Sequence, residues 1–258
     1  MSKTLGVPTP DQATYMLRAA SEDAGRTYKR QLLDLLDLRP GHTVLDVGCG
    51  PGTDLPALAE RVGASGRVIG VDQDPAMLAT ARERTAAVDT VEIREADAHV
   101  LPVAPGTVDR AKIDRVLMHV RSPAEVLAQL HTATRTGALV GLVEPDWDTL
   151  AVDSEDLETS RAFTRYTTEK VVRHATVGRG LARLAVQAGF RIETTITNAP
   201  LFTDFEHGDH TLGLGRNMQQ AIAEGHIDRT RGEAWFAGLA RGPFYASFTL
   251  VTVVCSRP

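Results

Sequence analysis

The stretch Val44-Leu45-Asp46-Val47-Gly48-Cys49-Gly50-Pro51-Gly52 decides the fold. A short apolar run typical of a buried strand leads into a loop with glycine at every second position, and a helical pattern follows over residues 54–62. Glycine lets the backbone turn tightly and approach a ligand where a Cβ would collide. Between a strand and a helix, such a loop predicts a site for a nucleotide-like group at the carboxyl edge of a parallel sheet.

Alternating strand and helix patterns continue along the chain and predict an α/β fold with helices on both faces of the sheet. We expect a doubly wound, mostly parallel, seven-stranded sheet with an antiparallel last strand and helical insertions. The expected strands cover residues 43–47, 67–71, 91–94, 108–113, 138–143, 191–197 and 248–255. The expected helices cover residues 17–38, 54–62, 75–85, 123–134, 154–174 and 179–188, with helical character over 208–239.

Composition excludes several classes of protein. Hydrophobic residues make up 43% and charged residues 24%, which is typical of a globular chain, and the net charge of −5 gives no general attraction for nucleic acid or an anionic membrane. No apolar run of about 18 residues and no signal-peptide core occur, so we expect a cytoplasmic protein. Cys49 and Cys255 form neither a disulfide framework nor a metal-ligand spacing. His207 and His210 are weak evidence for a metal, and an exposed loop without metal is expected there.

Acidic residues at the strand ends indicate which ligand the glycine loop binds. The third glycine, Gly52, departs from the dinucleotide spacing, and Asp46 before the loop would repel a phosphate while suiting a cationic ligand. Asp72, at the end of the second strand, can accept hydrogen bonds from both hydroxyls of a ribose. Asp97 follows the third strand and can receive an adenine amino group, with Ala98 leaving room for the ring. Taken singly, each acid is as well explained by a helix cap or a loop hydrogen bond.

With these residues in place, the chain resembles the class I S-adenosylmethionine-dependent methyltransferases, and within them the menaquinone-methyltransferase-like group of small-molecule enzymes. The resemblance covers residues 30–145 best, and the turn Thr136-Gly137-Ala138 departs from the family's Pro-Gly-Gly. It implies a Rossmann-like fold with S-adenosylmethionine as cofactor, a glycine loop around the methionine part, and two residues flanking the adenine, Gln73 and Met77. The implied cofactor-binding residues are Asp46, Gly48, Gly50, Gly52, Asp72, Gln73, Met77, Asp97, Ala98 and Asp114.

Candidate residues for the acceptor side follow the fourth and fifth strands. His119 is the best candidate for a general base, and the alternative, a structural histidine that bonds a backbone carbonyl, is strong. Arg115 is expected to meet the methionine carboxylate or an acidic substrate. Asp146 and Trp147 could recognise an amine or a hydroxylated ring, while the alternative for Trp147 is packing of the insertion against the sheet.

The sequence therefore predicts one methyltransferase domain over residues 1–258. Its parts are an N-terminal helical lid (1–40), a cofactor-binding core (41–147) and two substrate-cap insertions (148–178 and 206–243). The expected activity is methyl transfer to O, N or C of a small metabolite, with secondary metabolism as one setting. The alternatives are cyclisation or rearrangement with the same cofactor, a nicotinamide-dependent dehydrogenase, and a nucleic-acid or protein methyltransferase. We expect no nucleic-acid or membrane partner, and the oligomeric state stays open, a homodimer included.

Overall fold

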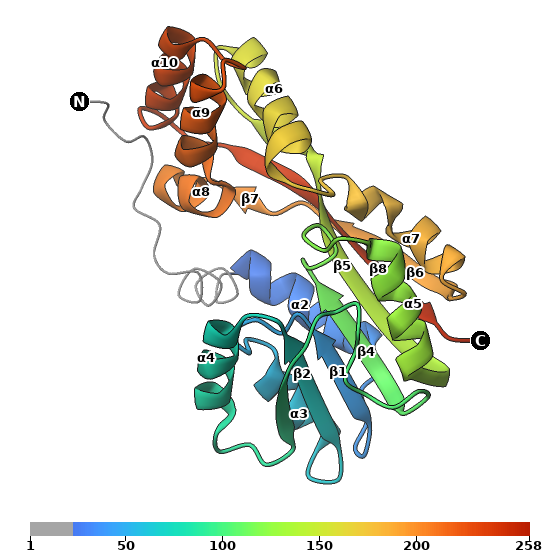
Figure 1. Ribbon diagram of the computed structural model, residues 1–258. Coiled ribbons are helices and arrows are strands. Elements are labelled where there is room, and N and C mark those ends of the chain that lie inside the picture. The colour runs from blue at the N-terminus through green and yellow to red at the C-terminus, as the bar shows by residue number, and fades with distance from the viewer. Residues whose placement is uncertain (1–22) are drawn as a thin grey trace.

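The computed structural model describes residues 23–258, which form a sheet flanked by helices and a helical cap at one end (Figure 1). The expected lid lies outside the described residues as far as residue 22. The strands are β1 Thr43–Val47, β2 Arg67–Asp72, β3 Val91–Glu95, β4 Val108–Asp114, β5 Thr134–Val152, β6 Arg191–Asn198, β7 Leu201–Phe202 and β8 Ala246–Ser256. The helices are α2 Asp23–Leu35, α3 Leu55–Val62, α4 Pro75–Thr85, α5 Pro123–Ala133, α6 Leu157–Tyr166, the π-helix η1 Thr167–Val171, α7 Val177–Gln187, α8 Phe205–Leu212, α9 Leu214–Ala223 and α10 Arg229–Leu239.

The strand order β3-β2-β1-β4-β5-β8-β6 confirms the doubly wound α/β fold. Strands β1 to β5 pair in parallel, and β8 lies between β5 and β6 and is antiparallel to both. The last strand in the chain is therefore the antiparallel one, as expected from the sequence. An eighth strand that was not expected, β7, has only two residues and pairs with the start of β8.

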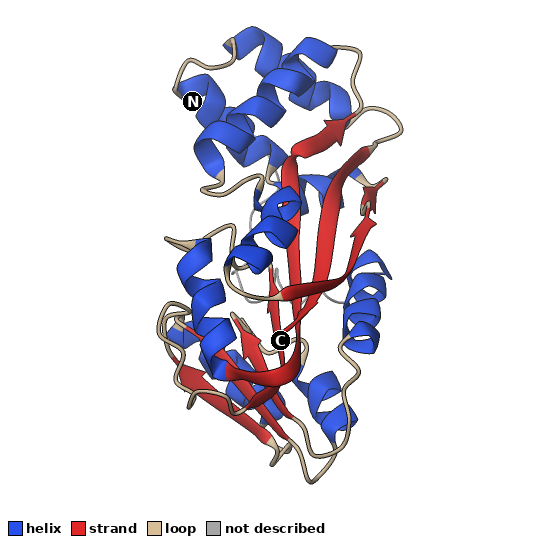
Figure 2. Ribbon diagram, turned by 90° about the vertical axis from the view of Figure 1, so that its right-hand side faces the viewer, coloured by secondary structure: helices blue, strands red, loops and turns tan. Residues whose placement is uncertain are grey.

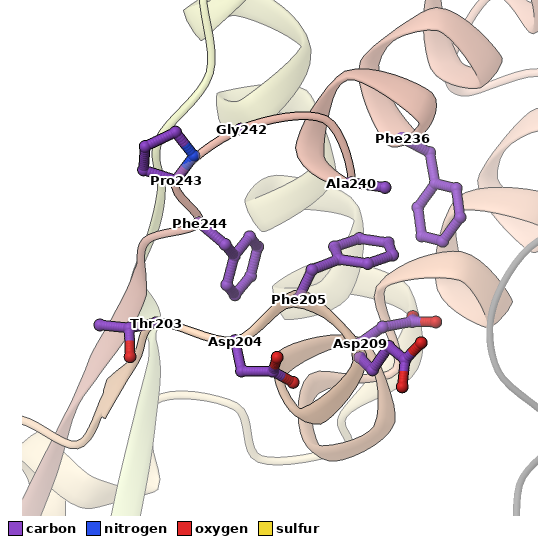
Figure 3. Close-up of a pocket in the computed structure, with 10 residues that line it drawn as sticks. Thr203, Asp204, Phe205, Asp209, Phe236, Ala240, Gly242, Pro243 and Phe244 are labelled. Atoms are coloured by element: carbon purple, nitrogen blue, oxygen red, sulfur yellow. The ribbon is translucent and has the colours of Figure 1, made fainter.

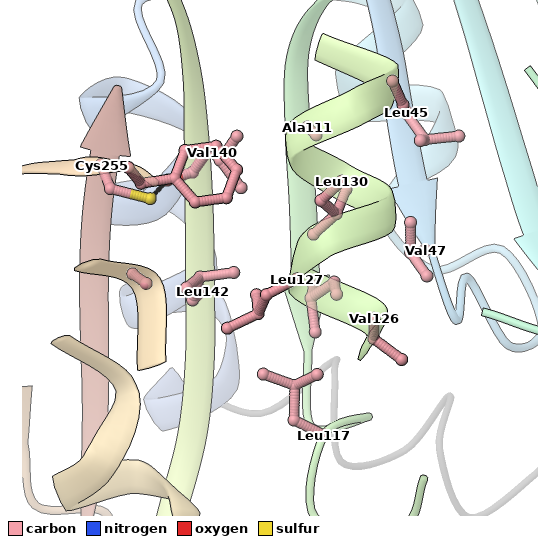
Figure 4. Close-up of a cluster of buried hydrophobic side chains, with 14 of the residues drawn as sticks. Leu45, Val47, Ala111, Leu117, Val126, Leu127, Leu130, Val140, Leu142 and Cys255 are labelled. Atoms are coloured by element: carbon pink, nitrogen blue, oxygen red, sulfur yellow. Dashed lines mark hydrogen bonds between the residues drawn. The ribbon is translucent and has the colours of Figure 1, made fainter. Parts of the chain in front are cut away.

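Side-chain alternation along the central strands separates two cores. Leu45, Val47, Ala111 and Ile113 face the helices α5 and α7 (Figure 4). Val44 lies on the opposite face of β1 and packs in a cluster with residues of α2, α3 and α4. Because successive residues of a strand point to opposite faces, helices on both sides bury both sets of side chains.

The cap is built on two strands that run past the end of the sheet (Figure 2). The sequence places the end of the fifth strand at residue 143 because a glutamate and a proline follow, but β5 continues to Val152 by pairing with β8. Pro145 stands opposite Leu250 within this antiparallel ribbon. A proline in the sequence is thus a poor guide to where a strand ends when the strand can pair with a long antiparallel neighbour such as β8.

The helices of the two insertions pack against each other around an aromatic core. Phe163 of α6 stacks on Trp235 of α10 with ring centroids 5.2 Å apart, and the Trp235 indole donates to Ser160 Oγ. In place of the single helix expected over 154–174, the α-helix α6 ends at Tyr166 and the π-helix η1 follows it. The segment 208–239 contains parts of three helices, α8, α9 and α10. Within residues 23–258, no helix is both long and apolar enough to cross a membrane.

Helix α7 approaches the middle of β5 so closely that only glycine fits at the contact. A Cβ on Gly178 would lie 2.8 Å from the backbone oxygens of Glu144 and Pro145. A Cβ on Gly180, two residues along the same helix, would meet only the flexible end of Arg183, at 3.3 Å. Gly178 therefore sets how near the helix lies to the strand.

We predict that Gly178→Ala lowers the free energy of unfolding by about 1–3 kcal/mol, because overpacking against backbone cannot be relieved by a side-chain rotation. Gly180→Ala is the matched control and should be neutral or stabilising by up to about 1 kcal/mol, since alanine is the better helix former. Urea unfolding followed by circular dichroism measures both variants. Equal losses in the two variants would contradict this account of the contact.

Candidate active site

A cavity of 740 Å³ opens at the carboxyl edge of the parallel strands, where the ends of β1, β2 and β4, the residues that follow β3 and the middle of β5 meet. The residues of its wall come from both the sheet and the cap, because Thr211 of α8 and Phe248 of β8 also line it. Most of the residues expected from the sequence lie on this wall. They are Gly48, Gly50, Asp72, Gln73, Met77, Asp97, Ala98, Asp114, Arg115, His119 and Trp147.

The glycine loop is held against the end of β2 by three of its amides. The Gly48 and Cys49 N–H groups donate to Val71 O at 2.7 and 3.0 Å, and the Gly50 N–H donates to Asp72 Oδ2 at 2.9 Å. Gly48 has φ +71°, and a Cβ there would lie 2.2 Å from Val116 Cγ2. Position 48 therefore requires glycine both for its backbone conformation and for its neighbour.

Asp72 is fixed in orientation by backbone amides. Its second oxygen, Oδ1, accepts the Asp74 N–H at 3.0 Å. A carboxylate has about four lone-pair positions, so each oxygen keeps capacity to accept a further hydrogen bond from the cavity.

Asp97 belongs to a relay that the sequence did not reveal. Its Oδ1 lies 2.5 Å from His99 Nδ1, and His99 Nε2 accepts the backbone N–H of Ser122 at 3.2 Å. Because Nε2 accepts, Nδ1 of the neutral ring carries the proton and donates to Asp97. These hydrogen bonds connect the residues after β3 to the N-terminus of α5. The signal in the sequence that could have indicated the Asp97–His99 contact is a histidine two residues after an aspartate.

A chain of alternating charges lies beneath the glycine loop. Lys112 Nζ contacts Asp46 Oδ1 at 2.9 Å and Asp54 Oδ2 at 2.8 Å, and Lys29 Nζ contacts the same Asp54 oxygen at 2.7 Å and Asp114 Oδ2 at 2.8 Å. We call these five residues the buried charge chain. Burial opposes ionisation of Asp54, but Lys112 and Lys29 outweigh it and hold the pKa of that carboxyl below its ordinary value. Burial likewise opposes the charge of Lys112, and Asp46 and Asp54 nevertheless raise its pKa.

Three of the expected site residues do not lie on the cavity wall. Asp46 is 1% exposed and faces Lys112, its register partner on β4, so its position is that of an anchor and not of a countercharge to the ligand. Gly52 is buried at the end of the loop. Asp146 pairs with Arg179 of α7 through both of its oxygens, which corrects its expected role in recognising a substrate amine.

Residues 115–121, which we call the acceptor loop, form the wall between the sheet and the cap. Arg115 opens the loop with φ +58°, a conformation that non-glycine residues adopt at a cost of order 1 kcal/mol and that clusters at functional sites. Glu144 holds the loop from below: its carboxylate accepts the N–H groups of Val116, Leu117 and Met118 at 2.8, 2.5 and 3.4 Å. The side chain is fully buried, and this burial raises its pKa to about 8 against the three hydrogen bonds.

His119 and Trp147 face the cavity from the acceptor loop and β5. His119 is exposed to the cavity, and the described residues give its ring no hydrogen-bond partner, so the backbone carbonyl expected for a structural histidine does not appear among them. Partial burial, Arg115 and Arg173 lower its pKa. The Trp147 indole stacks on Phe248 with centroids 4.9 Å apart, and its N–H points to Met118 Sδ at 3.4 Å.

A second cavity of 580 Å³ lies within the cap, between α8, α10 and residues 240–244 (Figure 3). Its wall carries Phe205 and Phe244, whose rings meet edge to face, and two acids that already serve the fold. Asp204 caps α8, and Asp209 accepts the N–H of Gly215. No strand end of the parallel sheet reaches it.

His207 and His210 lie in helix α8 and not in an exposed loop, which corrects the sequence-based expectation for this segment. Over residues 23–258, no group of three or more His, Cys, Asp or Glu side chains is placed to hold a metal ion.

Comparison with known proteins gives one family and several relatives. Residues 38–194, more than half of the chain, match the family described as a methyltransferase domain. An uncharacterised 37.1 kDa protein of transposon Tn4556 from Streptomyces fradiae is 46% identical over 95% of this chain and 71% of its own length. Demethylmenaquinone methyltransferase of Staphylococcus aureus is 29% identical over 49% of this chain, which spans only 53% of that relative.

Among solved structures, the fold is similar to geranyl diphosphate C-methyltransferase of Streptomyces coelicolor, determined with Mg²⁺, geranyl diphosphate and S-adenosyl-L-homocysteine. The TM-score is 0.57 at 15% identity, with 100% of this chain and 94% of the other covered. At this identity the likeness concerns the fold.

We predict that Lys112→Met lowers the free energy of unfolding by about 3–5 kcal/mol, because Asp46 loses its cation and Asp54 keeps only Lys29. Lys170→Met, a change of the same type at an exposed position of η1, should stay within about 0.5 kcal/mol of the wild type. Urea unfolding at pH 7 measures both. A loss below 1 kcal/mol for Lys112→Met would show that the buried charge chain is not needed for stability.

Glu144 predicts a specific pH dependence of stability. A folded-state pKa of about 8, above the ordinary value of 4.5, means that the folded protein binds the proton more tightly. Its contribution is complete below pH 4.5 and is lost as the pH rises through 8, at up to about 1.4 kcal/mol per pH unit between these values. Glu144→Gln cannot ionise, so we expect its unfolding free energy to fall less than that of the wild type from pH 5 to 9.

Urea unfolding at four pH values tests the Glu144 prediction. The variant Glu83→Gln, changed at an exposed position of α4, is the control and should follow the wild-type pH dependence. Parallel curves for the wild type and Glu144→Gln would mean that Glu144 does not titrate in this range.

Proposed function

The chain belongs to the methyltransferase-domain family, and we propose that it transfers a methyl group from S-adenosylmethionine to an oxygen, nitrogen or carbon atom of a small metabolite. The observation that carries the proposal is the cavity at the strand ends. There the glycine loop, Asp72 and Asp97 line one wall, and His119 and Trp147 line another. One wall can hold an adenosine, and the other carries an imidazole and an indole. This arrangement suits the transfer of a group from one bound ligand to another.

The cofactor fits the side chains that are present. Gly48 and Gly50 bring bare backbone to the cavity, where a methionine moiety can lie close. Asp72 keeps lone pairs for the ribose hydroxyls, and Asp97 is oriented by His99 to accept from an adenine amino group. Met77 and Ala98 provide the apolar surface that a flat ring requires. The cavity volume of 740 Å³ falls within the range of about 300–1,000 Å³ that is usual for small-molecule sites.

The cofactor supplies an electrophilic methyl group on a sulfonium. The protein must then hold a nucleophile in line with the methyl–sulfur bond, and positioning of this kind can supply much of the rate. We assign the methionine amino group to Asp114, which lines the cavity at the end of β4. His119 is the candidate for the proton of a hydroxyl or amine acceptor, because its lowered pKa leaves the imidazole neutral and able to accept a proton at pH 7.

The alternatives are less well supported. Cyclisation or rearrangement with the same cofactor is not favoured by family membership, and a nicotinamide-dependent dehydrogenase belongs to a different family. A nucleic-acid or protein substrate would need an extended basic surface, which the net charge of −5 does not favour. We therefore retain a small-molecule acceptor and a cytoplasmic location as parts of the proposal.

Incubation with methyl-labelled S-adenosylmethionine and a deproteinised pool of small metabolites tests the function. We expect S-adenosylhomocysteine and a labelled small molecule in equal amounts. S-adenosylhomocysteine should also raise the melting temperature while NADH does not, because only a ligand of the folded state stabilises it. Stabilisation by NADH alone would refute the proposal.

For the labelled acceptor, we predict that His119→Ala lowers kcat by about 10²-fold, as expected when a general base is removed. The affinity for S-adenosylhomocysteine, measured by calorimetry, should stay unchanged, because His119 lies on the opposite wall. The kcat/KM of the wild type should fall only below about pH 6.5, because the pKa of the imidazole is lowered from its ordinary value of 6.5. Near-normal turnover in the variant would leave His119 without a role in proton transfer.

A further inference from the structure

We propose that the methyl acceptor is an anion: a small molecule in which a carboxylate or phosphate group is joined to an apolar or aromatic body, with Arg173 and Arg115 binding the anionic group. This inference rests on the proposed function and specifies the substrate class of the same cavity.

The two walls of the cavity carry opposite charges. The wall formed by the ends of β2 and β3 carries Asp72, Asp74 and Asp97. The wall from the acceptor loop to the cap carries Arg115, Arg121 and Arg173, and Asp114, directly before the loop, is the acid that lines the cavity beside them. Guanidinium groups on this side of the cavity attract an anion and repel an amine.

The arginines differ in how far their charges are already neutralised. Arg121 pairs with Glu125 at 3.1 Å on the surface, and Arg115 Nε lies 3.5 Å from Asp114 Oδ1. In the part of the chain that the structure describes, Arg173 has no acidic residue within ion-pair distance. Because a planar guanidinium matches the geometry of carboxylate and phosphate, Arg173 is well suited to receive the ligand's charge.

The arginines also lie near the candidate base. Arg115 and Arg173 both lower the pKa of His119, so both guanidinium charges act on the same imidazole. All three residues line the same cavity, so an anion bound by Arg173 and Arg115 would hold the acceptor in the cavity that His119 faces. This juxtaposition connects recognition of the anion to removal of the proton.

An apolar surface adjoins the arginines and suits the body of the acceptor. Trp147, stacked on Phe248, and Met118, beneath the indole N–H, line the same wall. Aromatic faces and a thioether favour a ring or an unsaturated chain. Asp146, the acid expected to meet a cationic substrate here, is paired with Arg179 and is not among the described residues that line the cavity.

Calorimetry on the protein saturated with S-adenosylhomocysteine tests the inference with two pairs of probes. One pair compares 4-hydroxybenzoate with 4-hydroxybenzamide, and the other compares phenyl phosphate with phenol. We expect the anion of at least one pair to bind about 10-fold more tightly than its neutral partner, and the better pair distinguishes a carboxylate from a phosphate site. Arg173→Gln should remove this preference, whereas Arg165→Gln, at an exposed position of α6 outside the cavity wall, should keep it.

The outcomes separate the inference from the proposed function. If S-adenosylhomocysteine binds but neither anion is preferred, or if Arg173→Gln retains the preference, the anionic-acceptor inference is wrong while the methyltransferase proposal stands. If S-adenosylhomocysteine itself does not bind, the proposed function fails. Unchanged S-adenosylhomocysteine affinity in Arg173→Gln shows that the variant is folded and that its effect is confined to the acceptor wall.

Discussion

One ammonium group, that of Lys112, holds both ends of the glycine loop. Asp46 precedes the loop and Asp54 follows it, and both carboxylates contact Lys112 Nζ within 3 Å. Lys29 extends the contact to Asp114 at the end of β4, so the buried charge chain joins α2, β1, the start of α3 and β4. Charges this deeply buried add little net stability, but each can lie only where its partner lies. The loop is therefore fixed by a constraint beneath it and not by the ligand it is proposed to hold.

Another buried acid, Glu144, supports the wall formed by the acceptor loop. Glu144 collects three consecutive amides of the acceptor loop, while Gly178 lets α7 lie directly over the backbone of Glu144 and Pro145. Both walls thus rest on acids that do not face the cavity. Residues on the wall can then differ in charge without disturbing the support, which explains how an acidic and a basic wall coexist in one site.

The sequence was sufficient for the sheet, the glycine loop and the position of Asp72 and Asp97 on the cavity wall, because these depend on local patterns at the ends of β1, β2 and β3. Asp46 was expected to face a cationic ligand, whereas it faces Lys112, a partner that lies 66 residues away and is revealed only by strand register. A lysine within a buried central strand was the available signal, since such a charge requires a partner. Arg173 and Phe248 reach the cavity through the cap and the β5–β8 ribbon, and no local pattern predicts that long-range pairing.

The division of charge between the walls determines where the electrostatic interactions change during the proposed reaction. The acidic wall favours a cationic donor, and transfer of the methyl group converts a sulfonium to a neutral thioether, so the long-range attraction between this wall and the cofactor weakens as the reaction is completed. An anionic acceptor keeps its contact with the arginines when it is methylated at an atom other than the anion. The electrostatic change on transfer then involves both walls: the donor loses the positive charge of the sulfonium, and His119 gains a positive charge when it takes the proton of the acceptor. Lys112 and Lys29 hold the donor wall in place whether or not the positive charge of the donor is present.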